Sequence, residues 1–333
     1  MLMNKKLLTI IFSFFCTFIL TKQTVIANPS KIIRSATDVG KPLQCTGVPI
    51  RRKIFLEVKE LEGYVEGKKS YKYWTFNGTV PGPFERVCEG DIVEVQLKSH
   101  KDNELLHSVD FHAVTGQGGG SSFTGDLEPG QEKSFTFKAL KPGLFVYHCA
   151  TPPVAQHISK GQYGLILVQP QAGLPKVDRE FYIMQGELFT KEVSAEKVEF
   201  DYDRMLNEKP SYIVFNGAFN ALTGSNALKA KVGETIRIYF GVGGPNMISS
   251  FHIIGEIFDR VYNLGSLSSP PLKDVQTVLV PAGGSVVTEI KLEVPGTFAI
   301  VDHSLSRMEK GLVGHLEVTG KENPEIYKKG VGQ

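Results

Sequence analysis

The chain of 333 residues is too long for one small core and suits two domains of about 150 residues each. Its 41% hydrophobic and 22% charged residues are typical of a globular protein, which excludes disorder over most of the chain. A formal net charge of +2 excludes a strongly basic nucleic-acid binder. The 34 glycines, 18 prolines and 21 phenylalanines favour turns and strands, so we expect a mostly β protein.

The first 27 residues have the pattern of a secretory signal peptide. Lys5 and Lys6 precede a continuous apolar run from Leu7 to Leu20, and small or compact residues offer a cleavage site at Val25-Ile26-Ala27. The run is shorter than the roughly 20 residues that a membrane span requires, and retention as an uncleaved anchor is the alternative. We therefore expect a periplasmic protein with no membrane span in the mature chain, whose net charge becomes −1 once this segment is removed.

Three of the four cysteines lie after this segment. In an oxidising compartment Cys45 and Cys88 can either pair as a disulfide or remain free, because the sequence does not show how close they come. Cys149 is left unpaired. Metal ligation is the best explanation for such a lone thiol in an exported protein.

The chain also contains a diverged internal repeat. Phe76-Asn77-Gly78 returns as Phe215-Asn216-Gly217, and Asp110-Phe111-His112 is echoed by Ser250-Phe251-His252. Further matches join Glu89–Val95 to Val232–Ile238, Pro142–Phe145 to Pro295–Phe298, and Gly161–Val168 to Gly311–Val318. A period this long indicates a duplicated domain rather than a solenoid.

Each copy has the pattern of a β-sandwich. Residues 91–97 and 132–138 alternate apolar and polar side chains between Gly/Pro turns, as half-buried strands do. The one segment with a fair helical pattern is Lys191–Leu206. We expect an all-β chain with an N-terminal extension over 28–52, domains over 53–170 and 179–320, a linker over 171–178 and a tail over 321–333.

The strand pattern places metal-binding side chains of the first copy on two faces. Neighbouring side chains of an extended strand point to opposite sides. His107 therefore faces away from Asp110 and His112. His148 and Cys149 are adjacent and also diverge. This arrangement predicts two separate metal sites.

The first predicted site combines one thiolate with two imidazoles. His107, Cys149 and His157 are the ligand set of a blue, type 1 copper centre, which a weak axial ligand completes. Gln162 follows at a suitable spacing, in a role where Met is usual and Gln is a known replacement. The alternative is a buried structural cysteine beside unrelated histidines.

The second predicted site is built from imidazoles. His112 and His148 need a third ring, for which His303 is the natural candidate. Three imidazoles suit copper or zinc and leave a position open for water or substrate. Asp110 and His252 add titratable groups near such a metal, although Asp110 could instead orient a ligand and His252 could be a core residue.

The histidine pattern excludes a two-domain laccase. Such an enzyme holds a cluster of three coppers with histidines arranged largely as His-x-His pairs. The chain has eight histidines and no His-x-His pair. The cluster would take eight histidines and the blue site two more, so the eight histidines of this chain are too few, and they are wrongly spaced.

Five motifs over both copies carry these side chains: His107-x2-Asp110-x-His112, His148-Cys149-Ala150-x-Pro152, Gly161-x-Tyr163-Gly164, Ser250-Phe251-His252-x-Ile254-Gly255 and Asp302-His303-Ser304. Together they resemble the copper-containing nitrite reductases with two cupredoxin domains, over about residues 53–320. The resemblance implies two tandem cupredoxin-like Greek-key β-sandwich domains, and homotrimers with a type 2 copper at each subunit interface.

The resemblance also implies a role for each predicted site residue. Type 1 copper would lie on His107, Cys149, His157 and Gln162, the last in place of the family's Met. Type 2 copper would lie on His112, His148 and His303 of a neighbouring subunit. Asp110 and His252 correspond to the pair that delivers protons, and Ile254 to the apolar residue that shapes the nitrite pocket.

The implied activity is dissimilatory reduction of nitrite to nitric oxide by one electron, in denitrification or nitrate assimilation. The electron would come from a small donor, a cupredoxin or c-type cytochrome, and pass from type 1 to type 2 copper, with two coppers per subunit. Alternatives are a copper oxidoreductase for another small nitrogen or oxygen species, and a non-catalytic electron-transfer cupredoxin. An electron carrier, however, needs neither Asp110 nor His252 beside an open metal.

Overall fold

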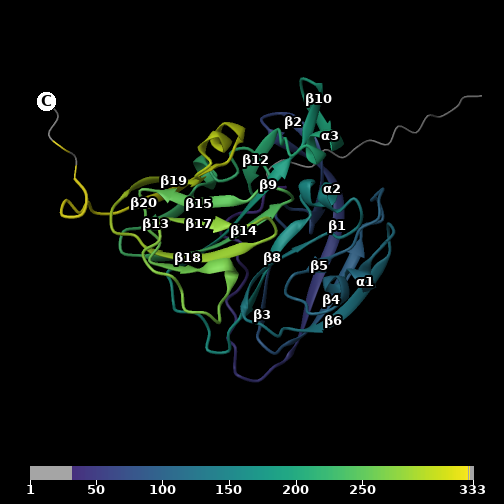
Figure 1. The fold of residues 1–333 in the computed structure, drawn as a ribbon, viewed down its shortest axis with the longest axis horizontal. Coiled ribbons are helices and arrows are strands. Elements are labelled where there is room, and N and C mark those ends of the chain that lie inside the picture. Colours follow the sequence, from purple (N-terminus) through teal and green to yellow (C-terminus); the bar gives the residue numbers. More distant parts are fainter. Residues whose placement is uncertain (1–31, 329, 331–333) are drawn as a thin grey trace, which may run out of the picture.

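The computed structural model describes residues 32–328 and 330, and its chain forms two β-sandwiches side by side. Figure 1 shows the first half, purple to teal, beside the green-to-yellow second half. The predicted signal peptide lies outside the described residues, as do the first residues of the N-terminal extension and the end of the tail. Strands dominate both halves, which confirms the all-β class.

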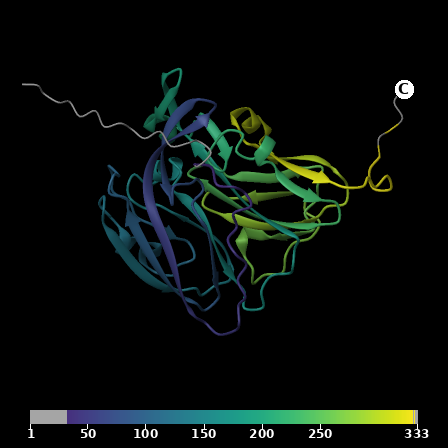
Figure 2. The same cartoon turned by 180° about the vertical axis from the view of Figure 1, so that it is seen from behind.

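The first sandwich packs a six-stranded sheet against a four-stranded one. The larger sheet has the order β10 (Thr190–Ser194), β11 (Lys197–Phe200), β2 (Lys69–Phe76), β1 (Arg51–Glu66), β4 (Ile92–Ser99) and β6 (Glu132–Lys138). The smaller has the order β3 (Phe84–Cys88), β8 (Tyr163–Gln169), β7 (Gly143–His148) and β5 (Asp110–Phe111). Seen from behind, β1 runs the length of this sandwich as the long purple strand in Figure 2.

Alternation along the strands builds the core of the first sandwich. In β4 every second side chain is buried, including Val93, Val95 and Leu97. These side chains join Phe111 and Tyr147 of the opposite sheet in one apolar cluster. The predicted half-buried strands over 91–97 and 132–138 are thus confirmed as β4 and β6.

The second sandwich packs two five-stranded sheets. One has the order β12 (Tyr212–Phe215), β9 (Arg179–Leu188), β14 (Thr235–Gly244), β18 (Ser285–Lys291) and β16 (Arg260–Tyr262). The other has the order β13 (Leu228–Lys231), β20 (Val313–Thr319), β19 (Gly296–Asp302), β15 (Ser249–Ile254) and β17 (Thr277–Val280). Phe251 stacks on Phe240 and on Phe258 between these sheets, with ring centroids 4.1 and 5.6 Å apart.

Helices are short and lie in the connections. They are α1 (Ser121–Thr124), α2 (Val154–Ser159), α3 (Tyr202–Leu206) and the 3₁₀ turns η2 (Gln117–Gly120), η3 (Gly224–Asn226), η4 (Asn263–Gly265) and η5 (Leu305–Lys310). Within residues 32–328, none of these helices combines the length and the apolar character needed to cross a bilayer.

The helical prediction for Lys191–Leu206 is wrong over most of its length. Its first part forms the hairpin β10–β11, and only its last residues form α3. Val193 and Val198 are β-branched and favour strands, and Val198 is buried. Lys197 pairs with Ser70, so this hairpin of the second half extends a sheet of the first sandwich.

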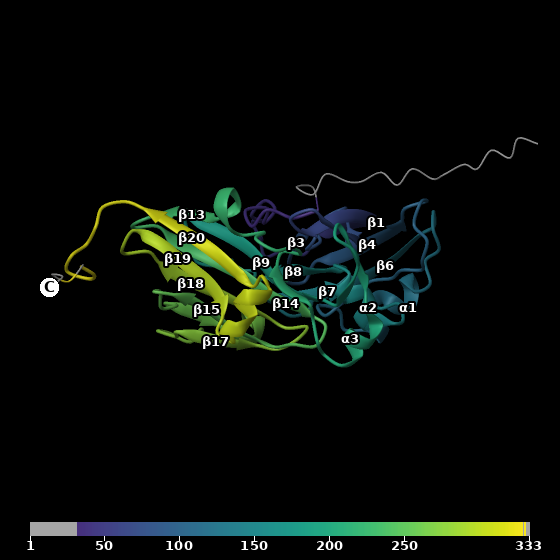
Figure 3. The same ribbon diagram turned by 90° about the horizontal axis from the view of Figure 1, so that it is seen from above.

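The two sandwiches share an apolar core at their junction. Tyr182 of β9 and Tyr239 of β14 belong to the same buried cluster as Leu165 of β8. Phe84 packs against both tyrosines, with ring centroids 5.0 and 4.8 Å apart. Figure 3 shows β8, β9 and β14 meeting at this junction, close to β7 and α2. Burial between the halves thus fixes their relative orientation.

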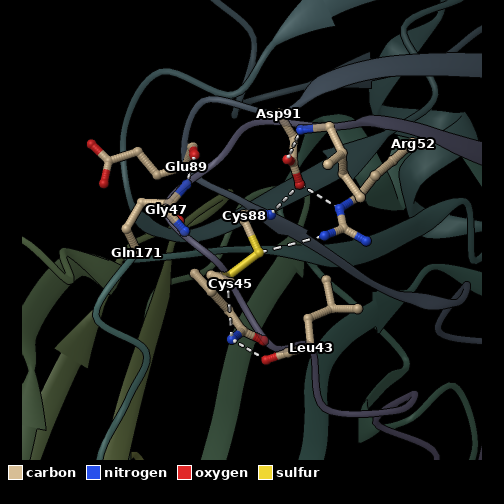
Figure 4. Close-up of a disulfide and its surroundings, with 10 residues drawn as sticks. Leu43, Cys45, Gly47, Arg52, Cys88, Glu89, Asp91 and Gln171 are labelled. Atoms are coloured by element: carbon tan, nitrogen blue, oxygen red, sulfur yellow. Dashed lines mark hydrogen bonds and ion pairs between the residues drawn. A yellow bond between two sulfur atoms is a disulfide. The ribbon is translucent and has the colours of Figure 1, made fainter.

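A disulfide attaches the N-terminal segment to the first sandwich (Figure 4). It joins Cys45 to Cys88 at the end of β3, with Cα atoms 5.7 Å apart. Beside it, Gln171 accepts a hydrogen bond of 2.9 Å from the Gly47 amide, and Gln169 donates one of 3.2 Å to the Leu43 carbonyl. The segment is therefore held by covalent and polar contacts together.

Candidate metal centres

Two groups of metal-binding side chains form at one end of the first sandwich. Among the described residues, groups of His, Cys, Asp or Glu able to hold a metal are His107–Cys149–His157 and Asp110–His112–His148. Within each group the ligand atoms lie within 4.8 Å of one another. Strand β5 is shorter than the extended segment assumed from the sequence, and His107 lies outside it in an isolated bridge with Leu127.

The first group surrounds one buried point. His107, Cys149 and His157 are at most 2% exposed. The Cys149 Sγ and His157 Nδ1 atoms lie 3.3 Å apart. Oε1 of Gln162 lies 3.1 and 3.0 Å from Nδ1 of His107 and of His157. A thiol, two imidazole nitrogens and an amide oxygen thus converge, which is a donor set that fits type 1 copper.

Local structure explains how Gln162 returns to this group. Helix α2 carries His157, and the chain turns at Gly161, where φ is +111°. A Cβ atom at Gly161 would lie 3.1 Å from the Trp74 carbonyl oxygen, so only glycine fits this turn. The Cys149 amide then donates a 3.2 Å hydrogen bond to the Gln162 carbonyl and closes the loop between them.

The surroundings favour a thiolate at Cys149. Burial by itself would raise the pKa of Cys149, but hydrogen bonding and charge from His107 and His157 hold this pKa well below its usual range. The Ser108 amide also donates to Sγ over 3.4 Å. The sulfur is therefore held in its negatively charged form, which binds metal cations.

Three residues around this group were missed by the sequence analysis. Trp74 packs against His157 and His107, with ring centroids 4.5 and 5.6 Å apart. The Lys160 ammonium lies 4.7 Å from the Trp74 ring centroid and is nearly buried. Glu60 contacts Nε2 of His107, the ring nitrogen that points away from Gln162. Of these three, only Trp74 could have been singled out from the sequence, because it is the single tryptophan of the chain.

The second group brings two imidazoles together edge to face, beside the β5–β7 ladder. Nε2 of His112 and Nε2 of His148 lie 3.1 Å apart. His148 Nδ1 donates a 2.9 Å hydrogen bond to the Cys149 carbonyl, which leaves Nε2 free as a ligand atom. Burial, and then the neighbouring His148, lower the pKa of His112. Both effects favour the neutral form of the His112 ring, which can bind a metal.

Two glycines shape the space around this group. At Gly119, where φ is +56°, an added Cβ would overlap the Asp110 carboxylate and lie 3.0 Å from the Phe111 carbonyl oxygen. At Gly283, which comes from the second sandwich, it would lie 3.3 Å from Cε1 of His112. The run of three glycines at 118–120 is visible in the sequence and could have indicated the close contact between Gly119 and Asp110. Nothing in the sequence linked Gly283 to His112.

His252 and His303 form a separate pair on the second sandwich, with ring centroids 5.3 Å apart. His303 is exposed and belongs to neither of the groups found among the described residues, so a single chain does not bring it to His112 and His148. His252 Nδ1 donates a 2.6 Å hydrogen bond to the Gln276 carbonyl. The side chain of Ile254 is on the same surface and 46% exposed.

Comparisons with known proteins find relatives named for copper. A family model described as multicopper oxidase matches residues 57–173. A protein named copper-containing nitrite reductase from Neisseria meningitidis serogroup B is 51% identical over 281 residues, which are 84% of this chain and 71% of that protein. One of the same name from Alcaligenes faecalis is 36% identical over 270 residues, covering 75% and 71%.

Solved structures show the same relationship. A copper nitrite reductase from Nitrosomonas europaea at pH 8.5 superposes with a TM-score of 0.73 at 37% sequence identity. The superposition covers 83% of this chain and 96% of that one. It confirms the predicted fold of two tandem cupredoxin-like Greek-key β-sandwich domains.

Proposed function

The chain belongs to the family of copper-containing nitrite reductases, and on this premise we propose that it reduces nitrite to nitric oxide. One nitrite ion, two protons and one electron give nitric oxide and water. The observation that best supports the proposal is that a Cys/His group and a two-histidine group are joined through consecutive residues, His148 and Cys149. Copper bound at these groups would supply the electron and polarise nitrite.

The first group would hold type 1 copper. His107 and His157 present Nδ1, Cys149 presents its thiolate, and Gln162 presents its amide oxygen. An amide oxygen is a harder donor than the thioether of a methionine, so this site favours Cu(II). The peptide bond between Cys149 and His148 is the shortest covalent connection to the other group and would carry the electron between them.

The second group would hold type 2 copper. His112 and His148 supply two imidazoles, and a third would come from His303 of another copy of the chain. The exposure of His303, and its place outside both groups within one chain, support this assignment. We therefore propose a homotrimer with a shared site at each interface, where Ile254 on the same surface borders the nitrite pocket.

Two side chains would handle the protons. Asp110 lies within ligand distance of His112 and His148, so its carboxyl group can hydrogen-bond a nitrite oxygen and donate a proton to it. His252 lies beside His303 and would come to the same site from the second copy, where it would supply the other proton through water.

The remaining proposals concern the setting of the enzyme. We propose export to the periplasm by the signal segment 1–27, and domain limits of 53–170 and 179–320. A small cupredoxin or c-type cytochrome would deliver the electron, as part of denitrification or nitrate assimilation. The cofactor would be copper, at about two ions per chain.

The decisive experiment measures nitric oxide released from nitrite by the purified copper-loaded chain with a reduced artificial donor. We expect nitric oxide, a blue absorption band and about two coppers per chain. Cys149→Ser should lose the blue band and turnover together. Two coppers with no nitric oxide would instead favour an oxidoreductase for another small molecule, or an electron carrier.

A further inference from the structure

The ring of His107 is held at both of its nitrogen atoms. Nδ1 faces Gln162 Oε1 at 3.1 Å, inside the first group. Nε2 points the other way and lies 3.3 Å from Oε1 of Glu60, whose side chain is only 2% exposed. If Nδ1 binds the metal, Nε2 carries the hydrogen and donates it to this carboxylate.

The Glu60 carboxylate is also held by groups other than His107. Its Oε1 accepts hydrogen bonds from the backbone amides of Glu104 and Leu105, at 2.8 and 2.9 Å. Its other oxygen lies 3.1 Å from the Lys72 ammonium. Three donors from two segments thus hold one buried carboxylate beside a single imidazole nitrogen.

These contacts also anchor the loop that carries His107. Asn103 accepts a 3.0 Å hydrogen bond from the Glu60 amide and donates one of 3.0 Å to the Val58 carbonyl. The connection from β4 to His107 is therefore tied to β1 at Val58 and at Glu60. Movement of this carboxylate would move the loop and the ring with it.

We propose that Glu60 is a positioning residue of the type 1 site, which sets both the orientation and the donor strength of His107. A carboxylate that accepts the remote N–H of a ligating imidazole fixes its tautomer and makes it a stronger base. A stronger imidazole donor stabilises Cu(II) more than Cu(I). Glu60 therefore acts in the same direction as Gln162 and lowers the potential of this site. The inference rests on the proposed type 1 function of the first group.

The test is redox titration of the copper-loaded full chain, followed at the blue band. Glu60→Gln keeps an oxygen for the two amides but removes the charge facing His107. We expect about a tenfold loss of Cu(II) affinity relative to Cu(I), which raises the potential by about 59 mV. Glu57→Gln is the matched control, because it removes the same charge from the same strand at a residue that pairs with Lys59.

The two variants separate the possible outcomes. A rise for Glu60→Gln that clearly exceeds the rise for Glu57→Gln supports the inference. Equal shifts would show that only the lost charge matters, and would overturn it. A wild-type protein without a blue band would contradict the proposed type 1 site itself, which is a different failure.

A measurement on the wild type covers the case in which Glu60→Gln does not fold. In the diamagnetic Cu(I) protein, the Nε2 proton of His107 should give a nitrogen-bound NMR signal that is protected from exchange with water. A signal that exchanges rapidly would mean that no buried acceptor holds this proton, and would overturn the inference.

Discussion

The two sandwiches carry the same histidine pair but use it in different surroundings. In the first, the rings of His112 and His148 lie 5.0 Å apart at the β5–β7 ladder. In the second, His252 and His303 lie 5.3 Å apart at the β15–β19 ladder. Each half thus holds one such pair, and the proposed site of three imidazoles would need a pair of each kind to meet.

The two pairs differ in the residue that follows or precedes the second histidine. Behind His148 stands the buried thiol of Cys149 with its two imidazoles. Next to His303 is the buried carboxylate of Asp302, which forms an ion pair with Arg307. This carboxylate also accepts hydrogen bonds of 3.1 and 2.9 Å from the backbone amides of Ser250 and Ser304. The equivalent place is thus occupied by an ion pair in the second sandwich and by metal-binding side chains in the first.

Glu60 of the first sandwich and Glu187 of the second are two buried glutamates with different surroundings. In the first sandwich, burial would raise the pKa of Glu60, but His107, two amides and Lys72 outweigh it and lower the pKa to about 2. In the second, burial raises the pKa of Glu187 to about 7, and only two amides counteract it by hydrogen bonding. Lys72 and His107 contact the Glu60 carboxylate directly, whereas Arg307 lowers the pKa of Glu187 only through its charge and does not offset burial.

The largest expected effect concerns Asp110, the carboxylic acid grouped with His112 and His148. Asp110→Asn removes a proton donor without changing the buried thiol group, so turnover should fall by about 10²–10⁴-fold. The blue band should stay intact, which separates lost chemistry from lost folding. Steady-state nitric oxide production is the measurement, and unchanged turnover would remove Asp110 from the mechanism.

The disulfide gives the next effect, because it crosslinks only the first half among the described residues. Cys45 and Cys88 are 43 residues apart, and closing such a loop stabilises the folded state by about 4 kcal/mol. Replacing both with serine should lower the urea midpoint and leave the blue band unchanged. A midpoint equal to that of the wild type would show that the polar contacts alone hold the N-terminal segment.

Glu187→Gln tests the buried carboxyl of the second half. The folded pKa of about 7 exceeds the unfolded value of 4.5, so the folded state binds more protons between these pH values. Wild-type stability should therefore fall as pH rises from 4.5 to 7, by about 3 kcal/mol in total. Glu187→Gln should lack this slope and be more stable at pH 8 in urea titrations. Parallel pH profiles would contradict the burial argument.

The smallest effect concerns the axial position. The repeat places Leu312 of the second half where the first has Gln162, so only one copy offers a donor there. Gln162→Met replaces an amide oxygen by a thioether and should raise the type 1 potential, by about 59 mV for a tenfold change in the preference for Cu(I). Redox titration at the blue band measures it, and a downward move would defeat this account.

Much of the fold and of the donor set was predictable from local patterns. Alternation along β4 and β6 placed their side chains correctly, since burial on one face of a sheet requires it. The same rule separated His148 from Cys149 into different groups. The helical pattern, by contrast, gave a wrong prediction over most of Lys191–Leu206, where pairing with the edge strand β2 stabilises a hairpin.

The sequence by itself determined the class of fold, the duplication and which donor types lie next to each other, because side-chain direction within a strand depends only on the backbone pleat. Only the tertiary structure decided which distant residues meet them. Glu60 beside His107, Gly283 beside His112, and the separation of His303 from the first pair depend on how sheets and loops pack, and spacing along the chain carries no such distances.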